Sequence, residues 1–183
     1  NIVKDQFQEF FHNESVFTLG VCNGCQMLSN LKDIIPGADF WPSFERNLSD
    51  QFEARLAQVK IFKTESVLLN DMDDWMVPVA SAHGEGRAVF KGNSLEELVK
   101  SNQIAMQFVD ALERSTEKYP INPNGSPNGI TGITASNGRI TIMMPHPERV
   151  FRKVQMSWHR GDWNEFSPWM QIFVNAKNFS ESS

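Results

Sequence analysis

The stretch Gly20-Val-Cys-Asn-Gly24 places a cysteine between two glycines, where a strand-like apolar run passes into a helix-like one. Glycines on both sides of a nucleophile allow the tight turn, called a nucleophile elbow, that lifts a side chain above a sheet. At such a turn Cys22 faces the N-terminus of the following helix, whose partial positive charge favours the thiolate. The backbone N–H of Asn23 then points towards an oxyanion formed beside Cys22. The pattern predicts a cysteine nucleophile, and the alternative is a buried structural cysteine beside glycines that only turn the chain.

Cys22 and Cys25 also form a C-x-x-C pair, which is compatible with two other kinds of site. A thioredoxin-like redox pair lies at a helix N-terminus too, although here the central dipeptide is Asn-Gly and no tryptophan precedes Cys22. A structural zinc site needs further ligands, and a second C-x-x-C is absent from the sequence. We expect Cys25 to be a small core residue on the inner side of the helix and expect no metal site, with the redox pair as an alternative.

A second candidate lies in Met143-Met-Pro-His-Pro-Glu-Arg149, directly after a predicted strand. Pro145 and Pro147 restrict the backbone on both sides of His146 and disfavour a helix there. In an extended chain His146 and Glu148 lie on the same side, so the carboxylate can hold the imidazole in one tautomer. The other ring nitrogen is then free to activate a thiol, as in a Cys-His-acid triad. The alternative is an ordinary hydrogen-bonded pair at the surface.

The elements that position these residues follow from the hydrophobic pattern, which predicts a single mixed α/β domain over residues 1–183. The opening segment 5–12 places Phe7, Phe10 and Phe11 on one helix face, and 17–21 is a short buried strand. Further strands are expected at 52–62, 77–81 and 104–109, with a helix at 95–101 that starts in a Ser94–Glu97 capping box. Residues 122–129 are expected to form a loop of successive turns. Residues 130–134 and 139–143 are expected to form a hairpin with a type I′ turn at Asn137-Gly138. Trp169 and Phe173 are expected on a closing helix that is packed by its aromatic residues.

Composition excludes several classes of protein. With 183 residues, 40% apolar and 21% charged, the chain is neither disordered nor fibrous. A net charge of −5 disfavours nucleic acid as a partner, and no apolar run approaches the length of about 18 residues that a membrane helix needs. Two cysteines and no signal peptide favour a reducing, cytoplasmic setting.

Two of these stretches carry a family resemblance. Gly20-Val-Cys-Asn-Gly-Cys-Gln26 resembles the G-x-C-x-G-x-Q elbow of class I glutamine amidotransferases, and Pro145-His-Pro-Glu148 resembles their P-H-P-E ending. More closely, the chain is similar along its whole length to the amidotransferase domain of the large, single-chain phosphoribosylformylglycinamidine (FGAM) synthases. The segments that carry this likeness are 20–27, 82–87, 122–130, 143–152 and 167–173. The resemblance implies a three-layer, flavodoxin-like α/β domain.

The same resemblance implies the chemistry. Cys22 attacks the side-chain amide of glutamine, His146 moves the proton, Glu148 orients His146, and Gln26 helps to hold the substrate. The ammonia passes to a separate synthetase domain of the same polypeptide, which uses ATP and magnesium to form FGAM in purine synthesis. This chain holds no phosphate-cradling glycine loop, so we expect no cofactor in it.

Two features of the family bear on what the chain can do. The segment 81–87, which includes His83 and two glycines, could approach the glutamine or a domain interface with its backbone, or be a plain turn. A complete domain of the family begins well upstream of Asn1, and the upstream part supplies a second oxyanion donor and a strand that pairs beside Phe17. We therefore expect an exposed strand edge, possible self-association and weak activity, and we retain a non-catalytic docking or structural role as the alternative.

Overall fold

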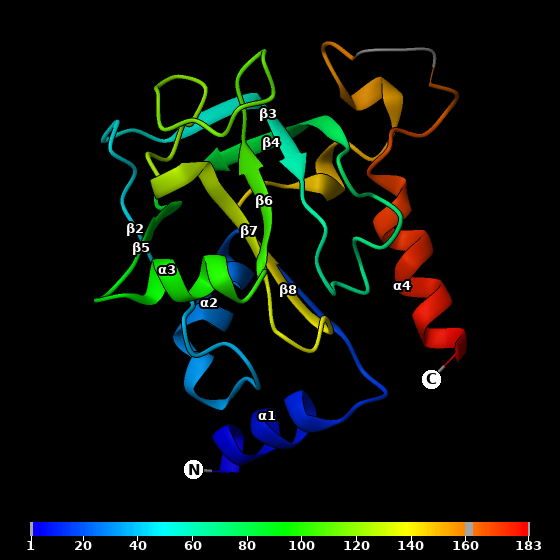
Figure 1. Cartoon of the computed structure of the whole chain (residues 1–183). Coiled ribbons are helices and arrows are strands. Elements are labelled where there is room, and N and C mark those ends of the chain that lie inside the picture. The colour runs from blue at the N-terminus through cyan, green and yellow to red at the C-terminus, as the bar shows by residue number, and fades with distance from the viewer. Residues whose placement is uncertain (1, 160–162, 183) are drawn as a thin grey trace.

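The computed structural model describes residues 2–159 and 163–182, which form a six-stranded sheet, a two-stranded sheet and four α-helices. The large sheet contains β1 (Thr18–Val21), β3 (Glu53–Ile61), β4 (Met76–His83), β6 (Ile104–Phe108), β7 (Ile130–Thr134) and β8 (Ile140–Met143). Its strand order is β1-β8-β7-β6-β3-β4, and β1 pairs with β8 in parallel while the other pairs are antiparallel (Figure 1). The small sheet pairs β2 (Ser43–Glu45) with β5 (Arg87–Val89).

Helices cover both faces of the large sheet. The α-helices are α1 (Ile2–His12), α2 (Asn23–Asn30), α3 (Ser94–Lys100) and α4 (Met170–Ser182), and the short 3₁₀ turns are η1 (Lys32–Ile34), η2 (Pro127–Gly129), η3 (Pro147–Arg149) and η4 (Lys153–Gln155). Leu28 of α2 and Leu98 of α3 pack in one apolar core, and Ile172 of α4 packs in a second together with Trp169, which directly precedes the helix. Figure 1 shows α2 and α3 on one side of the sheet and α4 on the other. The expected three-layer α/β architecture is therefore confirmed.

The sheet curls so that β4, at its far edge, contacts the segment that follows β8. The backbone N–H of His146, which follows β8, donates to the Ala80 carbonyl of β4 at 2.7 Å, although three strands lie between β8 and β4 in the sheet order. An irregular register between β6 and β7 adds to the bend, because a β-bulge increases local twist. Gly132 lies at this bulge, where an added Cβ would be 2.9 Å from the Cβ of Met106.

Helix α4 and the residue before it are held against the rest of the protein by polar contacts as well as by apolar packing. The indole N–H of Trp169 donates to the Pro78 carbonyl at 2.7 Å, and Trp169 is fully buried. Asn175 donates to the carbonyls of Leu68 and Asn70 at 2.9 and 2.7 Å. The expectation that Trp169 packs is confirmed, whereas Trp158, which precedes α4, is 59% exposed.

Two predicted turn and cap details are wrong. Helix α3 begins at Ser94 with Asn93 as its N-cap residue and without a side-chain cap, so the Ser94–Glu97 capping box does not form. In the hairpin between β7 and β8 only Gly138 has a positive φ, at +73°, whereas a type I′ turn needs positive φ at both central residues. The bond from the Ala135 N–H to the Ile140 carbonyl closes a longer loop than the predicted two-residue turn.

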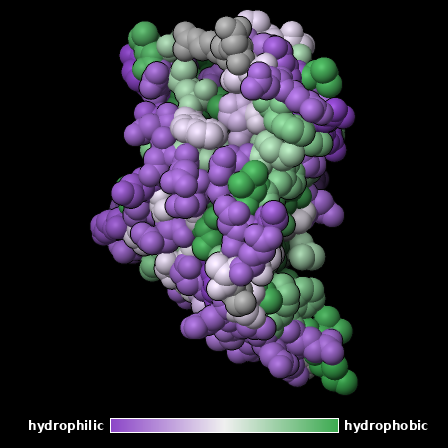
Figure 2. Space-filling view, turned by 90° about the vertical axis from the view of Figure 1, so that its right-hand side faces the viewer, coloured by the Kyte–Doolittle hydropathy of each residue, from purple (hydrophilic) through white to green (hydrophobic). Residues whose placement is uncertain are grey.

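Hydrophilic side chains cover much of the face shown in Figure 2, and apolar side chains lie at several places on it, including the end of the molecule formed by α1. The exposed apolar residues of α1 are Ile2, Val3 and Phe10, while Phe11 is buried. Among the described residues β1 pairs with β8 alone, so β1 is an edge strand of the sheet as expected, while its residues are half-buried or buried. Self-association through this edge stays a prediction. No helix of the described residues combines the length and apolar character needed to span a membrane.

The two glycines of the elbow differ in the space around them, which gives a matched pair of substitutions. A Cβ on Gly20 would be 2.6 Å from Leu28 Cδ1 and 2.9 Å from the Gly24 carbonyl oxygen, whereas a Cβ on Gly24 would meet nothing within 4 Å. We expect Gly20→Ala to lower the free energy of unfolding by about 1–3 kcal/mol through overpacking. We expect Gly24→Ala to leave it unchanged or raise it by up to about 1 kcal/mol through helix propensity. Urea unfolding measures both values, and equal effects of the two substitutions would contradict this description of the elbow.

Candidate active site

Cys22 lies at a strained turn between β1 and α2. Its φ of +52° and ψ of −109° are unusual for a residue that carries a side chain. The turn is held on both sides, because the Cys22 N–H donates to the Met143 carbonyl at 2.9 Å and the Cys22 carbonyl accepts from the Gln26 N–H at 3.1 Å. Gly20 lets α2 approach β1 closely, which places the first turn of the helix directly behind the cysteine. The predicted nucleophile elbow is therefore present in the fold.

The thiol of Cys22 is half-buried, and its electrostatics differ from the sequence-based expectation. Burial raises the pKa of Cys22, while a hydrogen bond from the Asn23 backbone N–H and the charge of Arg149 lower it in part. The charge of Glu148 raises the pKa further. The helix N-terminus thus favours the thiolate as predicted, but the loss of hydration is larger. Cys22 needs a base to remove its proton at neutral pH.

His146 lies on the segment after β8 with one ring nitrogen fixed and the other without a partner. Glu148 Oε1 is 2.6 Å from His146 Nδ1, which makes Nδ1–H the donor and leaves Nε2 as the basic nitrogen. The ring is 6% exposed, and its Nε2 is buried without a hydrogen-bond partner among the described residues. The predicted pairing of His146 with Glu148 is therefore present, and the free nitrogen has the character of a general base.

The parallel pairing of β1 with β8 brings the two halves of the site together. In this register Val21 lies opposite Met143, so Cys22 and the Pro145–Glu148 stretch both follow the carboxyl ends of adjacent strands. The charges of Glu148 and Arg149 in η3 both act on the pKa of the Cys22 thiol, Arg149 lowering it and Glu148 raising it. Cys22 and His146 share no hydrogen bond in this structure, and catalytic hydrogen bonds are often long before a substrate binds.

The turn formed by residues 83–86 lies against the helix that follows the nucleophile. This turn connects β4 to β5, and its Glu85 carbonyl accepts a hydrogen bond of 2.7 Å from the side-chain Nε2 of Gln26. Gln26 is in the first turn of α2, one residue after the buried Cys25. Two segments singled out from the sequence for different reasons, the elbow and residues 81–87, are thus joined at the site.

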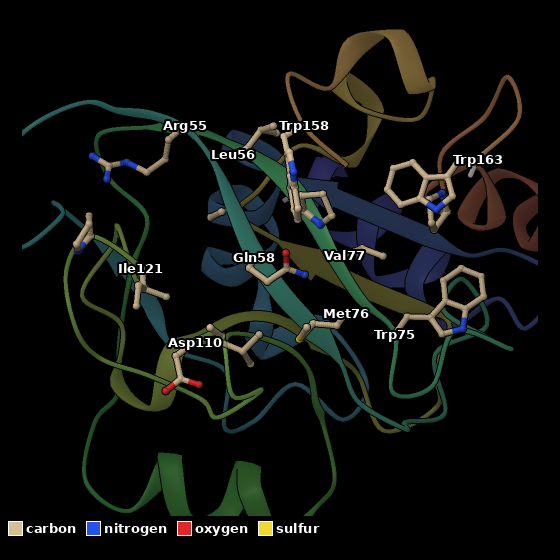
Figure 3. A pocket seen from close by; sticks show the side chains of 16 residues that line it. Arg55, Leu56, Gln58, Trp75, Met76, Val77, Asp110, Ile121, Trp158 and Trp163 are labelled. Atoms are coloured by element: carbon tan, nitrogen blue, oxygen red, sulfur yellow. The ribbon is translucent and has the colours of Figure 1, made fainter. Parts of the chain in front are cut away.

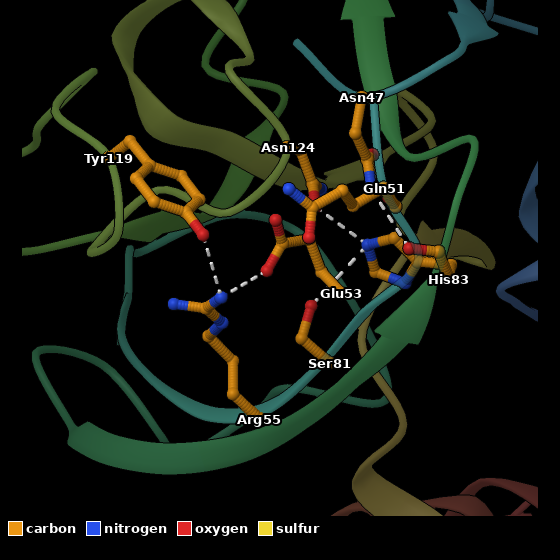
Figure 4. Close-up of polar contacts among 8 residues, drawn as sticks. All are labelled: Asn47, Gln51, Glu53, Arg55, Ser81, His83, Tyr119 and Asn124. Carbon is orange, nitrogen blue, oxygen red and sulfur yellow. Dashed lines mark hydrogen bonds and ion pairs between the residues drawn. The ribbon is translucent and has the colours of Figure 1, made fainter. Parts of the chain in front are cut away.

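The His83 imidazole itself faces the interior. His83 is 4% exposed, and its Nε2 lies 2.7 Å from Asn124 Oδ1 and 3.4 Å from Ser81 Oγ (Figure 4). Burial lowers the pKa of His83, and the charge of His146 lowers it as well, so a neutral imidazole is favoured at this position. Any contact of His83 with a substrate would therefore come from its backbone.

A partly buried ion pair adjoins His83. Glu53, which is 2% exposed, is opposite His83 in the β3–β4 register and pairs with Arg55, whose guanidinium also donates to the Tyr119 hydroxyl at 3.1 Å. Figure 4 shows these groups side by side with Asn47 and Asn124. This cluster was not predicted from the sequence. The spacing of Glu53 and Arg55, two residues apart in a predicted strand and so on the same face of it, was the signal that could have indicated it.

Cys25 does not share the environment of Cys22. Both cysteines have free thiols, but Cys25 is fully buried in the α2 core, and burial raises its pKa well above the usual range. A redox pair needs a resolving thiol that can ionise and reach the solvent. The position of Cys25 is that of the expected small core residue.

A cavity of about 770 Å³ lies on another part of the molecule (Figure 3). Trp75, Trp158 and Trp163 line it together with residues of β3 and β4 such as Gln58 and Met76. Its lining includes neither Cys22 nor His146 nor Glu148. Its polar end is formed by Arg55 and Asp110, which are already paired with Glu53 and Arg114. The cavity is therefore separate from the candidate active site.

The fold and the site together define a mixed α/β protein with a cysteine at a strained strand-to-helix turn and a histidine–carboxylate pair after the adjacent strand. Residues 1–180 match the CobB/CobQ-like glutamine amidotransferase domain. The chain belongs to this family, which confirms the resemblance to glutamine amidotransferases.

Solved structures share the fold at low sequence identity. PurLQS from Thermotoga maritima is 19% identical with a TM-score of 0.62, over 88% of this chain and 60% of that chain. A putative GMP synthase subunit from Thermoplasma acidophilum is 12% identical with a TM-score of 0.54, over 98% of this chain and 64% of that one. The chain thus spans less than two thirds of the length of either structure.

The raised pKa of Cys22 gives a prediction about its intrinsic reactivity. The thiolate is the nucleophile, so alkylation by a small neutral electrophile such as iodoacetamide should increase with pH through a midpoint above that of a free cysteine thiol. Peptide mass mapping of the alkylated protein at each pH measures the rate for each cysteine. Cys25 is the internal control and should stay unlabelled in the folded protein, because it is fully buried. A midpoint for Cys22 below that of free cysteine would contradict the dominance of burial.

Proposed function

We propose that this chain is the glutaminase part of an FGAM synthase, which releases ammonia from glutamine through a cysteine thioester. The observation that carries the proposal is the combination of the Cys22 elbow with the Nε2 of His146, a buried basic nitrogen whose opposite nitrogen is held by Glu148. Membership in the glutamine amidotransferase family supports glutamine as the substrate.

In the first half-reaction, His146 Nε2 takes the proton from the Cys22 thiol as the sulfur attacks the amide carbon of glutamine. The N–H of Asn23, which lowers the pKa of the Cys22 thiol, then donates to the oxyanion of the tetrahedral intermediate. Collapse of the intermediate breaks the carbon–nitrogen bond, and His146 gives its proton to the leaving nitrogen. The products are ammonia and a glutamyl thioester on Cys22.

In the second half-reaction water replaces the thiol as the nucleophile. His146 Nε2 accepts a proton from the water molecule while its oxygen attacks the thioester carbon. The carbon–sulfur bond then breaks, glutamate leaves, and the proton returns from His146 to the Cys22 sulfur. Glu148 keeps the imidazole in one tautomer and stabilises its charged form in both steps, since it binds Nδ1 throughout.

Recognition of glutamine involves groups near the first turn of α2. Gln26 donates through Nε2 to the Glu85 carbonyl, which leaves its Oε1 to accept a hydrogen bond from the substrate. The backbone of residues 83–86 and the open space beside Gly24 lie on the same part of the molecule, and we assign the substrate to this region. His83 takes part through its backbone rather than its imidazole.

The wider reaction is assigned from the motifs of the sequence and is supported by the shared fold with PurLQS. The ammonia passes to a synthetase domain of the same polypeptide, where ATP and magnesium drive conversion of formylglycinamide ribonucleotide to the amidine. The whole enzyme is a carbon–nitrogen ligase of purine biosynthesis in the cytoplasm. We place ATP and magnesium in the synthetase domain, not in this chain.

A second candidate function is a docking or structural module of the same enzyme that is catalytically impaired. The raised pKa of Cys22, which disfavours the reactive thiolate, favours it. The two candidates differ in one respect, which is whether Cys22 reacts with glutamine.

Glutamine hydrolysis in the natural full-length protein tests the proposal. We expect Cys22→Ala to abolish glutamate release, and His146→Ala to lower kcat by about 10²–10⁴-fold because the general acid–base is lost. In both variants the synthetase reaction should still proceed with added ammonia. Coupled assays of glutamate and of amidine formation, with glutamine or ammonium chloride as the nitrogen source, measure these effects.

Cys25→Ala is the matched control, because it removes a cysteine three residues away that is fully buried, and it should retain glutamine-dependent activity. Full glutamine hydrolysis by Cys22→Ala would eliminate the thioester mechanism. Amidine formation from ammonia but never from glutamine in the wild type would favour the impaired module. If the protein hydrolyses glutamine but forms the amidine from neither nitrogen source, the FGAM synthase assignment is ruled out and the glutaminase assignment still holds.

A further inference from the structure

The turn formed by residues 83–86 is fixed at both ends by two buried asparagines. Asn47, from the loop between β2 and β3, donates through Nδ2 to the His83 carbonyl at 2.8 Å and accepts at Oδ1 from the Gly86 N–H at 2.9 Å. Asn124, from the loop before η2, donates through Nδ2 to the Gly86 carbonyl at 2.9 Å. Its Oδ1 is 2.7 Å from His83 Nε2. Both asparagines are almost fully buried (Figure 4).

The orientation of Asn124 determines the protonation of His83. Because its Nδ2 donates to the Gly86 carbonyl, the atom that faces His83 Nε2 is an acceptor, so Nε2 carries the hydrogen. The lowered pKa of His83 is consistent with a neutral ring in that tautomer. A Cβ on Gly86 would be 2.4 Å from the His83 imidazole and 2.9 Å from Asn124 Nδ2, so His83 and Asn124 leave no room for a side chain at residue 86.

The middle of the turn is more exposed than its ends, where His83 and Gly86 are buried. Glu85 is exposed, and the group it presents to the site is its backbone carbonyl, which accepts from Gln26 Nε2 at 2.7 Å. A reversed Gln26 amide would set its oxygen against this carbonyl, so the bond fixes which end of the amide is available to a ligand. The direction of the Glu85 carbonyl in turn depends on the fixed positions of His83 and Gly86.

We propose that Asn47 and Asn124 are positioning residues for glutamine recognition: they hold the turn at residues 83–86 so that the Glu85 carbonyl orients the side chain of Gln26. The inference rests on the proposed glutaminase function. Neither asparagine touches the thiol or the base, so their effect is on the affinity for glutamine and not on the reactivity of Cys22.

Kinetics of glutamine hydrolysis by the natural full-length protein provide the test. Asn124→Ala should raise KM for glutamine by about 3- to 10-fold, the effect of a lost hydrogen bond, with kcat nearly unchanged. The rate of Cys22 alkylation by iodoacetamide, which makes no use of Gln26, should equal that of the wild type. Asn47→Asp keeps the acceptor for the Gly86 N–H and loses the donor to the His83 carbonyl. It should raise KM in the same way, and it serves as the second variant if Asn124→Ala does not fold.

A double-mutant cycle separates positioning from general loss of stability. If Asn124 acts through Gln26, the KM of the Asn124→Ala/Gln26→Ala protein should not exceed that of Gln26→Ala alone. Asn175→Ala is the matched control, because Asn175 is also buried and also bridges two carbonyls, but on α4. It should lower the melting temperature without changing KM.

The outcomes distinguish this inference from the proposed function. An unchanged KM in folded Asn124→Ala and Asn47→Asp proteins, or fully additive effects with Gln26→Ala, would overturn the positioning role while glutamine hydrolysis itself persists. A wild-type protein that hydrolyses no glutamine would overturn the proposed function, and the positioning role with it. If Asn175→Ala raises KM as much as Asn124→Ala does, the effect of Asn124→Ala is explained by general loss of stability, and the inference is overturned as well.

Discussion

The site depends on the parallel pairing of β1 with β8. Parallel strands place their carboxyl ends at the same edge of a sheet, and the opposition of Val21 and Met143 puts the elbow and the His146 segment at that edge together. The bond from the Cys22 N–H to the Met143 carbonyl extends the pairing into the strained residue itself. A shift of the register by one residue would turn alternate side chains to the other face and would also separate the nucleophile from its base.

The curl of the antiparallel part of the sheet brings β4 and the turn that follows it to the candidate site. Strand β4 returns to contact His146 through its Ala80 carbonyl, and the turn after β4 then reaches Gln26 on α2. The elbow with Cys22 and Gln26, the segment with His146 and the turn after β4 therefore come from three parts of the chain and are joined by hydrogen bonds. The hydrogen bonds of Asn47 and Asn124 to the turn at residues 83–86 favour one arrangement of the loops that carry them. This rigidity suits a site whose reacting atoms must be held within fractions of an ångström.

The sequence alone predicted the parts of the site that are local. An elbow and a His-x-Glu pair are contained in a few consecutive residues, so backbone stereochemistry was sufficient to assign Cys22, His146 and Glu148 as candidates. The surroundings of His83 could not be predicted, because Asn47 and Asn124 reach it from loops 36 and 41 residues away. The pKa of Cys22 depends on burial in the folded protein, which competes with the helix N-terminus, and only the latter is visible in the sequence. The Ser94 cap and the Asn137-Gly138 turn show the same limit, since tertiary packing selected other local conformations.

The most direct test of the central claim is the intact mass of the protein after exposure to a chloroketone analogue of glutamine. This reagent must occupy the glutamine site before it alkylates a thiol, so it reports recognition and nucleophile activation together. We expect one adduct in the wild type and in Cys25→Ala, and none in Cys22→Ala. No adduct in the wild type, or labelling of Cys22 and Cys25 to equal extents, would contradict a working glutaminase site built on the Cys22 elbow.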